Sequence, residues 1–220
     1  MLLTVVSEDK SLPEFIFGSN HLDYNSSHHI ISTSSCTAAC LAPLIKALHE
    51  GFGVEAATYN STHPLTMSQA TVDSSNNSNR RMGRSGLNNI VPKTQSSCDA
   101  VAEMFGFTLK GITMRAPSQS VASIDLTFLS KKPATYEELM AELKRRTQSD
   151  LKGALGFTQD EVVSSDFRGS DISCIVDSLA GHSVNPHFHK VVGWYDNEWG
   201  YTTRVSDMVV HMAKVDGNVK

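Results

Sequence analysis

A cysteine at the start of a predicted helix is the residue of this chain best placed to do covalent chemistry. Cys36 follows Ser34 and Ser35, two good helix N-caps, and Thr37 adds a hydroxyl beside it. The free backbone N–H groups and the dipole at a helix start favour a thiolate. A cysteine near a helix start is, however, more often a small buried hydrophobe. Local sequence alone therefore leaves two interpretations of Cys36, a nucleophile or a core residue.

One histidine has a context that suits a base for this thiol. His63 follows a predicted strand, Val54–Ser61, and precedes a turn that contains Pro64. A histidine at a strand end could take the proton of a thiol. The other histidines, among them His28, His29, His187 and His189, look like surface or strand-end residues.

Two patterns in the same region suggest other chemistry, and both are weak. Cys40 lies one turn after Cys36, but no C-x-x-C or His-x₃-His pattern accompanies the pair, so we predict no metal site. The stretch from Gly51 to Ala56 fits the relaxed dinucleotide fingerprint G-x-G-x-x-A. That fingerprint must follow a strand and open a helix. Here it follows a helix, so we expect a helix end and no cofactor.

The elements that must hold these residues follow from apolar periodicity and from turn residues. In the first half, strands are predicted at Leu2–Val6, Glu14–Phe17, His29–Ser32 and Val54–Ser61, and helices at 36–51, with Pro43 near its first turns, and at Ser96–Met104. Residues 68–86 form a polar loop that is too long for a plain connection.

The second half continues the mixture of strands and helices. It contains predicted strands at Val121–Leu129, Val162–Phe167, Ile172–Asp177 and Phe188–Tyr195, a helix at Thr135–Arg146 with a Thr135–Glu138 capping box, and a closing helix with Val205, Met208, Val209 and Met212 on one face. Strands outnumber helices and several follow one another directly. The fold class is therefore α+β, with a mixed, largely antiparallel sheet and flanking helices.

Composition excludes several classes of protein. The chain has 220 residues, a net charge of −4, 40% hydrophobic residues and a pI near 6.1. These values exclude global disorder and argue against a nucleic-acid partner. We find no signal peptide and no apolar run long enough for a membrane span. Four cysteines in a chain of this length are no disulfide framework, so we expect a cytoplasmic, reducing location.

Eight stretches, in order from about residue 2 to residue 213, resemble the phosphorylating glyceraldehyde-3-phosphate dehydrogenase family. They are Ser35-Cys36-Thr37-x-x-Cys40-Leu-Ala-Pro43, His63-x-x-Thr66, Asn89-Ile-Val-Pro92, Met114-Arg115-x-Pro117-Ser118, Val121–Asp125, Leu151-Lys-Gly-x-Leu-Gly156, Val162-Val-Ser-Ser-Asp-Phe167 and Trp194-Tyr-Asp-Asn-Glu-Trp-Gly-Tyr201. One such stretch would be weak, but eight in register are very specific.

The resemblance implies a role for each matching residue. Cys36 matches the nucleophile that attacks an aldehyde, and His63 matches the base. Thr66 and Arg115 match residues that bind the substrate phosphate, whereas Ser35 and Thr37 match residues around the attacking inorganic phosphate. Asn197 matches a residue that touches the nicotinamide amide of NAD, and Tyr201 packs nearby. A phosphorylated aldehyde, phosphate and NAD are the implied ligands, and a homo-oligomer is the implied assembly.

The resemblance also shows departures. The family begins with an NAD-binding Rossmann domain, and this sequence matches only its last part, so we expect residues 1–34 to be a remnant of that domain. Residues 35–196 are then the catalytic domain. Residues 197–220 form a helix that would pack on the missing domain, and we expect it to fold back or to bind a partner chain.

Some catalytic positions also differ from the family pattern. Ala38 and Ala39 replace a hydroxyl and an amide, Gln95 and Ser96 stand at phosphate-binding positions, and Asp99 replaces a lysine. Three functions are therefore compatible with the sequence: the catalytic domain of a dehydrogenase that is not competent alone, a scaffold or complex subunit, and a residual Cys/His acyl hydrolase.

Overall fold

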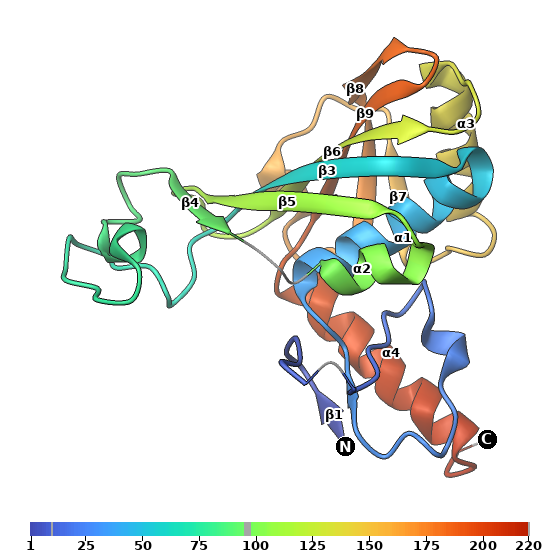
Figure 1. Ribbon diagram of the computed structural model, residues 1–220, viewed down its shortest axis with the longest axis horizontal. Coiled ribbons are helices and arrows are strands. Elements are labelled where there is room, and N and C mark those ends of the chain that lie inside the picture. Colours follow the sequence, from blue (N-terminus) through green and yellow to red (C-terminus); the bar gives the residue numbers. More distant parts are fainter. Residues whose placement is uncertain (10, 95–97, 220) are drawn as a thin grey trace.

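The computed structural model describes residues 1–9, 11–94 and 98–219. Its centre is a seven-stranded sheet in the order β4-β5-β3-β6-β9-β8-β7 (Figure 1). The strands are β3 (Val54–His63), β4 (Val91–Thr94), β5 (Thr108–Arg115), β6 (Ala122–Ser130), β7 (Leu155–Thr158), β8 (Cys174–Asn185) and β9 (Phe188–Tyr195). Four of the neighbouring pairs are antiparallel, and β3/β5 and β7/β8 are parallel. The sheet is therefore mixed and largely antiparallel, as predicted.

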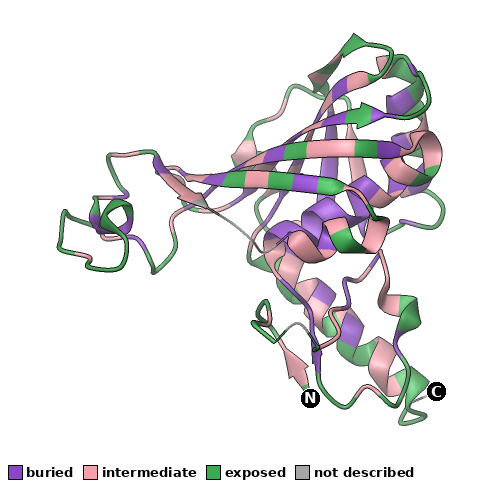
Figure 2. Ribbon diagram, viewed as in Figure 1, coloured by how far each residue is buried: buried purple, intermediate pink, exposed green. Residues whose placement is uncertain are grey.

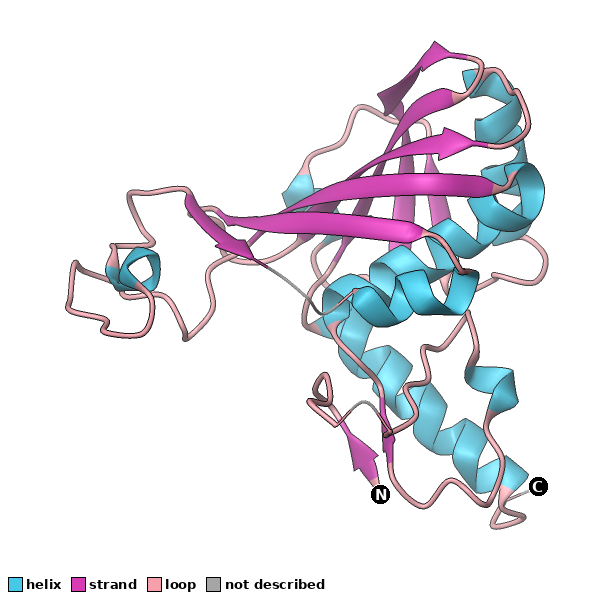
Figure 3. Ribbon diagram, in the orientation of Figure 1, coloured by secondary structure: helices cyan, strands magenta, loops and turns pink. Residues whose placement is uncertain are grey.

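Three helices pack on the sheet and on each other (Figure 3). They are α1 (Cys36–Phe52), α2 (Asp99–Phe105) and α3 (Tyr136–Thr147). Helix α1 is buried almost all round, and Leu41, Leu44 and Ile45 have no exposed surface (Figure 2). Pro43 lies inside α1, which continues to Phe52 despite the missing N–H. The capping box of α3 forms as predicted, with Thr135 accepting from the Glu138 N–H and Glu138 accepting from the Thr135 N–H.

The stretch from Gly51 to Ala56, which fits the relaxed dinucleotide fingerprint, forms the end of a helix, as expected. Gly53 caps α1 with a φ of 70°, and its N–H donates to the His49 carbonyl. That left-handed conformation suits glycine because it has no Cβ. The segment therefore turns the chain from α1 into β3, which is the connection the site depends on.

Helix α4 (Trp199–Val215) and the N-terminal segment form a second, smaller unit beside the sheet (Figure 1). Met208 of α4 is completely buried against Phe15, Tyr24 and Ile31. The predicted apolar face is thus used only in part, because Val209 stays 51% exposed. In this structure the helix packs on the chain's own first 34 residues. The boundaries at residues 34 and 196 stay a prediction.

Short or misplaced strands are the main differences from the sequence prediction. The N-terminal runs shrink to β1 (Leu2–Leu3) and β2 (Ile31–Ser32), with a single bridge at Glu14, and residues 21–23 form a 3₁₀ turn, η1 (His21–Asp23). The predicted strand Val162–Phe167 is a loop with a 3₁₀ turn, η3 (Ser164–Phe167). Strands β4, β5 and β7 were not predicted. The predicted helix start at Ser96 falls outside the described residues.

The long polar loop extends away from the body of the molecule (Figures 1 and 2). We call residues 66–90 the arm; it contains the 3₁₀ turn η2 (Arg80–Gly83). Its backbone bonds close on the arm itself, for example from Ser74 N–H to the Gly83 carbonyl and from Gly86 N–H to the Ala70 carbonyl.

Candidate active site

Cys36 and His63 meet because a helix and a strand of similar length run in opposite senses. Helix α1 carries the chain about 25 Å from Cys36, since each of its 17 residues rises about 1.5 Å. After the turn at Gly53, the 10 residues of β3 return over about 33 Å. His63 ends this return, and its Nε2 lies 3.6 Å from the Cys36 Sγ.

Arg115 joins this pair through the register of two parallel strands. His63 ends β3 and Arg115 ends β5, and the two residues are direct register partners. His63 Nδ1 lies 2.9 Å from the Pro64 carbonyl oxygen, and Arg115 Nη1 donates to the same oxygen at 3.1 Å. Arg115 Nη1 also lies against His63 Nδ1. The sheet therefore holds the histidine ring between a thiol and a guanidinium.

Burial keeps the thiol and the imidazole neutral before substrate arrives. Burial, with the nearby positive charge of Arg115 as the second cause, lowers the pKa of His63 to about 4. It also raises the pKa of Cys36, against the opposing effects of Thr37 and Arg115. In the tautomer whose Nδ1–H donates to the Pro64 carbonyl, Nε2 is the atom that can accept the proton of Cys36.

The positive charge beside the histidine suits an anion. Arg115 is only 8% exposed, and its Nε is buried without a hydrogen-bond partner in the described part of the chain. A buried unpaired donor is costly unless a ligand satisfies it. Lys93 of β4 adds a second positive charge, and burial and Arg115 lower the pKa of its ammonium group. The sequence analysis did not identify Lys93. It is a single lysine in β4, a strand that was not predicted, so no local pattern marked it.

Of the hydroxyl residues expected to bind phosphate, Ser35 and Thr37 lie at the start of α1, whereas Thr66 lies in the arm. Ser35 caps α1 by accepting from the Ala38 N–H, which leaves it next to Cys36. Thr37 is buried, and its hydroxyl pairs with the Tyr195 hydroxyl at 3.1 Å. Tyr195, which we had not singled out, also pairs with Ser61 and so ties α1 to β3 and β9.

Thr66 belongs to the arm and is not joined to the Cys36–His63–Arg115 group by any hydrogen bond among the described residues. It is exposed, its N–H and hydroxyl donate to Gln69, and its hydroxyl oxygen lies 3.0 Å from that of Ser68. A phosphate held by both Thr66 and Arg115 would therefore bridge the arm and the sheet.

Asn197, two residues before α4, and Tyr201, in the first turn of α4, reach the site from the same segment. The Asn197 Oδ1 accepts from the Val121 N–H at 3.1 Å, so the NH₂ group is the part of this amide left for a ligand. The Tyr201 hydroxyl donates to the Ser34 carbonyl at 3.1 Å and lies 2.9 Å from the Thr33 hydroxyl.

The departures from the family pattern have different structural settings. Ala38 and Ala39 lie in the hydrophobic core, and their apolar side chains need no hydrogen-bond partner there. Asp99 is the first residue of α2. Gln95 and Ser96 lie outside the described residues.

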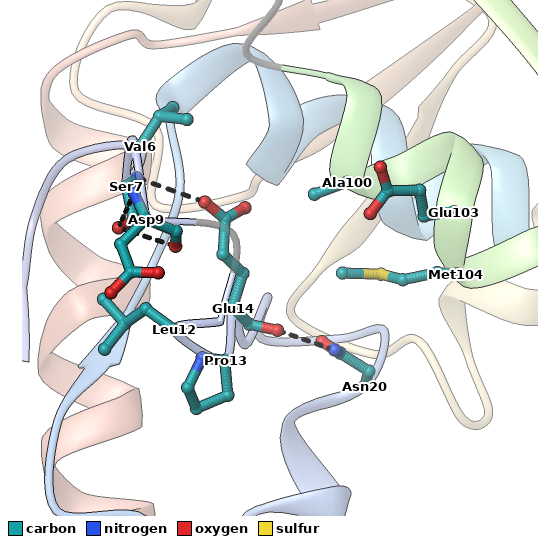
Figure 4. A pocket seen from close by; sticks show the side chains of 10 residues that line it. All are labelled: Val6, Ser7, Asp9, Leu12, Pro13, Glu14, Asn20, Ala100, Glu103 and Met104. Carbon is teal, nitrogen blue, oxygen red and sulfur yellow. Dashed lines mark hydrogen bonds between the residues drawn. The ribbon is translucent and has the colours of Figure 1, made fainter.

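Two cavities differ in what they could bind. A cavity of about 290 Å³ adjoins the site and is lined by His63, Val121, Trp194 and several hydroxyl residues. Another, of about 300 Å³, lies between the N-terminal segment and α2 (Figure 4). Its walls carry the carboxylates of Asp9, Glu14 and Glu103. Negative charge disfavours a phosphorylated ligand there, so the first cavity is the one relevant to this chemistry.

Other site types are not seen in the part of the chain that is described. All four cysteines are free, and Cys40, Cys98 and Cys174 are buried. No group of three metal-binding side chains occurs in residues 1–9, 11–94 and 98–219. Over the same residues, every helix is too short or too polar to cross a membrane.

Comparison with known proteins gives one consistent result. Residues 35–197 match the family model for the glyceraldehyde 3-phosphate dehydrogenase C-terminal domain. The chloroplastic glyceraldehyde-3-phosphate dehydrogenase of Guillardia theta is 43% identical over 100% of this chain and 58% of its own length. The cytosolic enzyme of Antirrhinum majus is 42% identical over 96% of this chain and 64% of its own length. This chain thus spans about 60% of the length of these relatives.

Proposed function

Because this chain belongs to the glyceraldehyde-3-phosphate dehydrogenase family, we propose that it carries the catalytic site for oxidation of a phosphorylated aldehyde. Cys36 is the nucleophile, His63 is the base and Arg115 binds the substrate phosphate. The observation that supports this most is the 3.6 Å contact of the Cys36 Sγ with His63 Nε2, beside a buried guanidinium with an unpaired Nε.

The first step needs only residues of this chain. The Cys36 sulfur attacks the aldehyde carbon, a sulfur–carbon bond forms, and the carbonyl oxygen takes up negative charge. The thiol proton passes to His63 Nε2, which then returns a proton to that oxygen to give a thiohemiacetal. A phosphate dianion on Arg115 would offset the positive charge that lowers the pKa of His63. The phosphorylated substrate would therefore strengthen the base that it needs.

The residues described here fit the nicotinamide end of NAD and no more of it. The fixed amide of Asn197 would hold the carboxamide, with Tyr201 beside it. NAD, when bound, supplies the hydride acceptor that turns a thiohemiacetal into a thioester. Ser35 lies next to the sulfur, and we place the inorganic phosphate that cleaves the thioester there, with the backbone N–H of Thr37 contributing from the first turn of α1.

The reverse acyl transfer tests this proposal without any cofactor. An acyl phosphate should react with the Cys36 thiol to give a thioester and free phosphate, so we would incubate the chain with acetyl phosphate and with 3-phosphoglyceroyl phosphate. Mass spectrometry should find the acyl group on the peptide of Cys36, faster with the second probe. A Cys98→Ala variant should behave like the wild type. If Cys36→Ser is acylated as well as the wild type, the proposal is wrong.

A residual acyl hydrolase is the second candidate, because a Cys–His pair at 3.6 Å can cleave activated esters without NAD. Turnover of an activated ester would have to stop in a Cys36→Ala variant. Acylation of Cys36 without turnover favours the dehydrogenase half-reaction instead. Absence of both leaves the scaffold or complex-subunit function.

Partners and location are also proposals. We expect a homo-oligomer, or a partner chain on the part of α4 that stays exposed around Val209 and Val210. We also expect a cytoplasmic location, although the relatives include both chloroplastic and cytosolic enzymes.

A further inference from the structure

Two residues of the described chain other than glycine have a left-handed backbone. Ser34 has a φ of 59° and Val121 a φ of 66°. This conformation is uncommon for serine and is a genuine outlier for a β-branched valine. Residues are held in such a conformation only where their surroundings impose it, and they cluster at functional sites.

Both strained residues flank the candidate site. Ser34 precedes the cap residue Ser35 and so controls how the chain enters α1 at Cys36. Val121 precedes β6 and lines the cavity that His63 also lines. One strained position therefore lies just before the thiol in the chain, and the other lines the cavity beside the imidazole.

The start of α4 holds both of them. The Tyr201 hydroxyl donates to the Ser34 carbonyl at 3.1 Å, and the Asn197 Oδ1 accepts from the Val121 N–H at 3.1 Å. Tyr201 also pairs with the hydroxyl of Thr33, which is only 6% exposed. Because these bonds go to backbone groups of the strained residues or to their neighbours, they act directly on the backbone conformation.

We infer that Tyr201 is a positioning residue for the nucleophile: its hydroxyl holds Ser34 in the left-handed conformation that aims Cys36 at His63. The inference rests on the proposed function in one respect, namely that Cys36 is the nucleophile. Without the hydroxyl, Ser34 relaxes toward an extended backbone. The Ser34–Ser35 peptide then rotates, and Cys36 turns away from the ring that takes its proton.

The rate of alkylation of Cys36 by iodoacetamide, followed by mass spectrometry of each cysteine peptide, tests this without cofactor or substrate. The matched pair is Tyr201→Phe and Tyr24→Phe. Both remove one hydroxyl that is bonded to another segment, since the Tyr24 hydroxyl donates to Asp216 at the far end of α4. We expect Tyr201→Phe to slow alkylation of Cys36 about tenfold, because small misplacements of reacting groups are costly. Tyr24→Phe should leave the rate unchanged.

A third variant separates positioning from general loss of stability. Glycine adopts a left-handed backbone without help, so Ser34→Gly should restore most of the rate in the Tyr201→Phe background. Thermal unfolding of each single variant measures its change in stability. If Tyr201 has a merely structural role, Tyr201→Phe and Tyr24→Phe should slow alkylation only in proportion to their loss of stability.

The outcomes separate the two ideas. If wild-type Cys36 is not acylated by 3-phosphoglyceroyl phosphate, the proposed function fails and this inference fails with it. If Cys36 is reactive and Tyr201→Phe reacts at the wild-type rate, the inference alone is overturned. Slower reaction in Tyr201→Phe, with rescue by Ser34→Gly, supports it.

Discussion

The group of Cys36, His63 and Arg115 and the arm at residues 66–90 each contain one residue expected to bind the substrate phosphate, Arg115 and Thr66, yet they are built in different ways. His63 is 4% and Arg115 8% exposed, and both are fixed by strand register. In the arm, the Arg84–Asp73 ion pair has side chains more than 60% exposed, and its Oδ1–Nε bond closes only the arm itself. Charges at exposed sites are screened by water, whereas buried charges keep their strength.

The comparison teaches which of the two regions should control the chemistry. A buried guanidinium with an unpaired Nε already carries the cost of desolvation, so an anion gains more there than at an exposed hydroxyl. Residues of the sheet should therefore have large effects on reactivity, and residues of the arm small ones. The following changes test that contrast.

Replacing the base should have the largest effect. In His63→Gln, the Cys36 proton has no acceptor, so acylation of Cys36 by 3-phosphoglyceroyl phosphate should slow about 10²- to 10⁴-fold. Rates from quenched-flow mass spectrometry would measure this. The exposed His29→Gln serves as the control and should match the wild type. A loss of less than fivefold in His63→Gln would mean that the 3.6 Å contact is not catalytic.

Acid should destabilise the sheet region. His63 has a pKa of about 4 in the folded chain and about 6.5 when unfolded. Above pH 6.5 neither state binds the proton. As the pH falls from 6.5 to 4, the unfolded chain binds it first, so the free energy of unfolding decreases, by on the order of 3 kcal/mol for this residue.

Urea unfolding at pH 7 and pH 4.5 would measure this loss, and His63→Gln should lose less stability than the wild type between the two. His21, whose pKa burial also lowers to about 4, contributes in the same direction and remains in both proteins. Equal losses in the wild type and in His63→Gln would show that His63 is not held neutral.

Removing the buried guanidinium should come next. Inorganic phosphate that occupies the substrate-phosphate site on Arg115 is expected to protect Cys36 from alkylation. In Arg115→Gln the phosphate concentration needed should rise about 10- to 100-fold, because hydrogen bonds to charged groups are among the strongest. Arg84→Gln in the arm removes an exposed arginine and should change this concentration little. If the two variants behave alike, burial is not what makes Arg115 effective.

The smallest effect is expected from the arm. Thr66→Ala removes one exposed, neutral hydroxyl, so phosphate protection should weaken no more than about fivefold. The same titration measures it. If phosphate protection weakens as much in Thr66→Ala as in Arg115→Gln, the expected difference between the arm and the sheet is wrong. The arm would then have to close over the sheet when phosphate binds.

Much of the site could be predicted from sequence because its signals are local. Ser34 and Ser35 before an apolar periodic run predicted a helix that starts at Cys36, and the helix starts there. The strand that ends near His63 and the capping box of α3 rest on equally local patterns. The family resemblance then supplied candidate roles, including that of Arg115, which local patterns had not singled out.

Other features could not be predicted because they depend on contacts between distant segments. Strand β5 alternates imperfectly, so it was missed, although its register is what places Arg115 beside His63. Val162–Phe167 has the composition of a strand, but no neighbouring strand pairs with it within the described chain. Lys93 lay in another missed strand, and its influence on the site appears only once β4 pairs with β5.

The sequence by itself determined the elements whose signals lie within a few residues: the capped helix at Cys36, the turn at Gly53 and the amphipathic helices. It also determined the family, through eight motifs in order. Only the tertiary structure decided the protonation of the site, the unpaired Arg115 Nε and the hold of α4 on Ser34 and Val121. Burial, register and left-handed backbone conformations are imposed by residues far apart in the chain, and no local pattern records them.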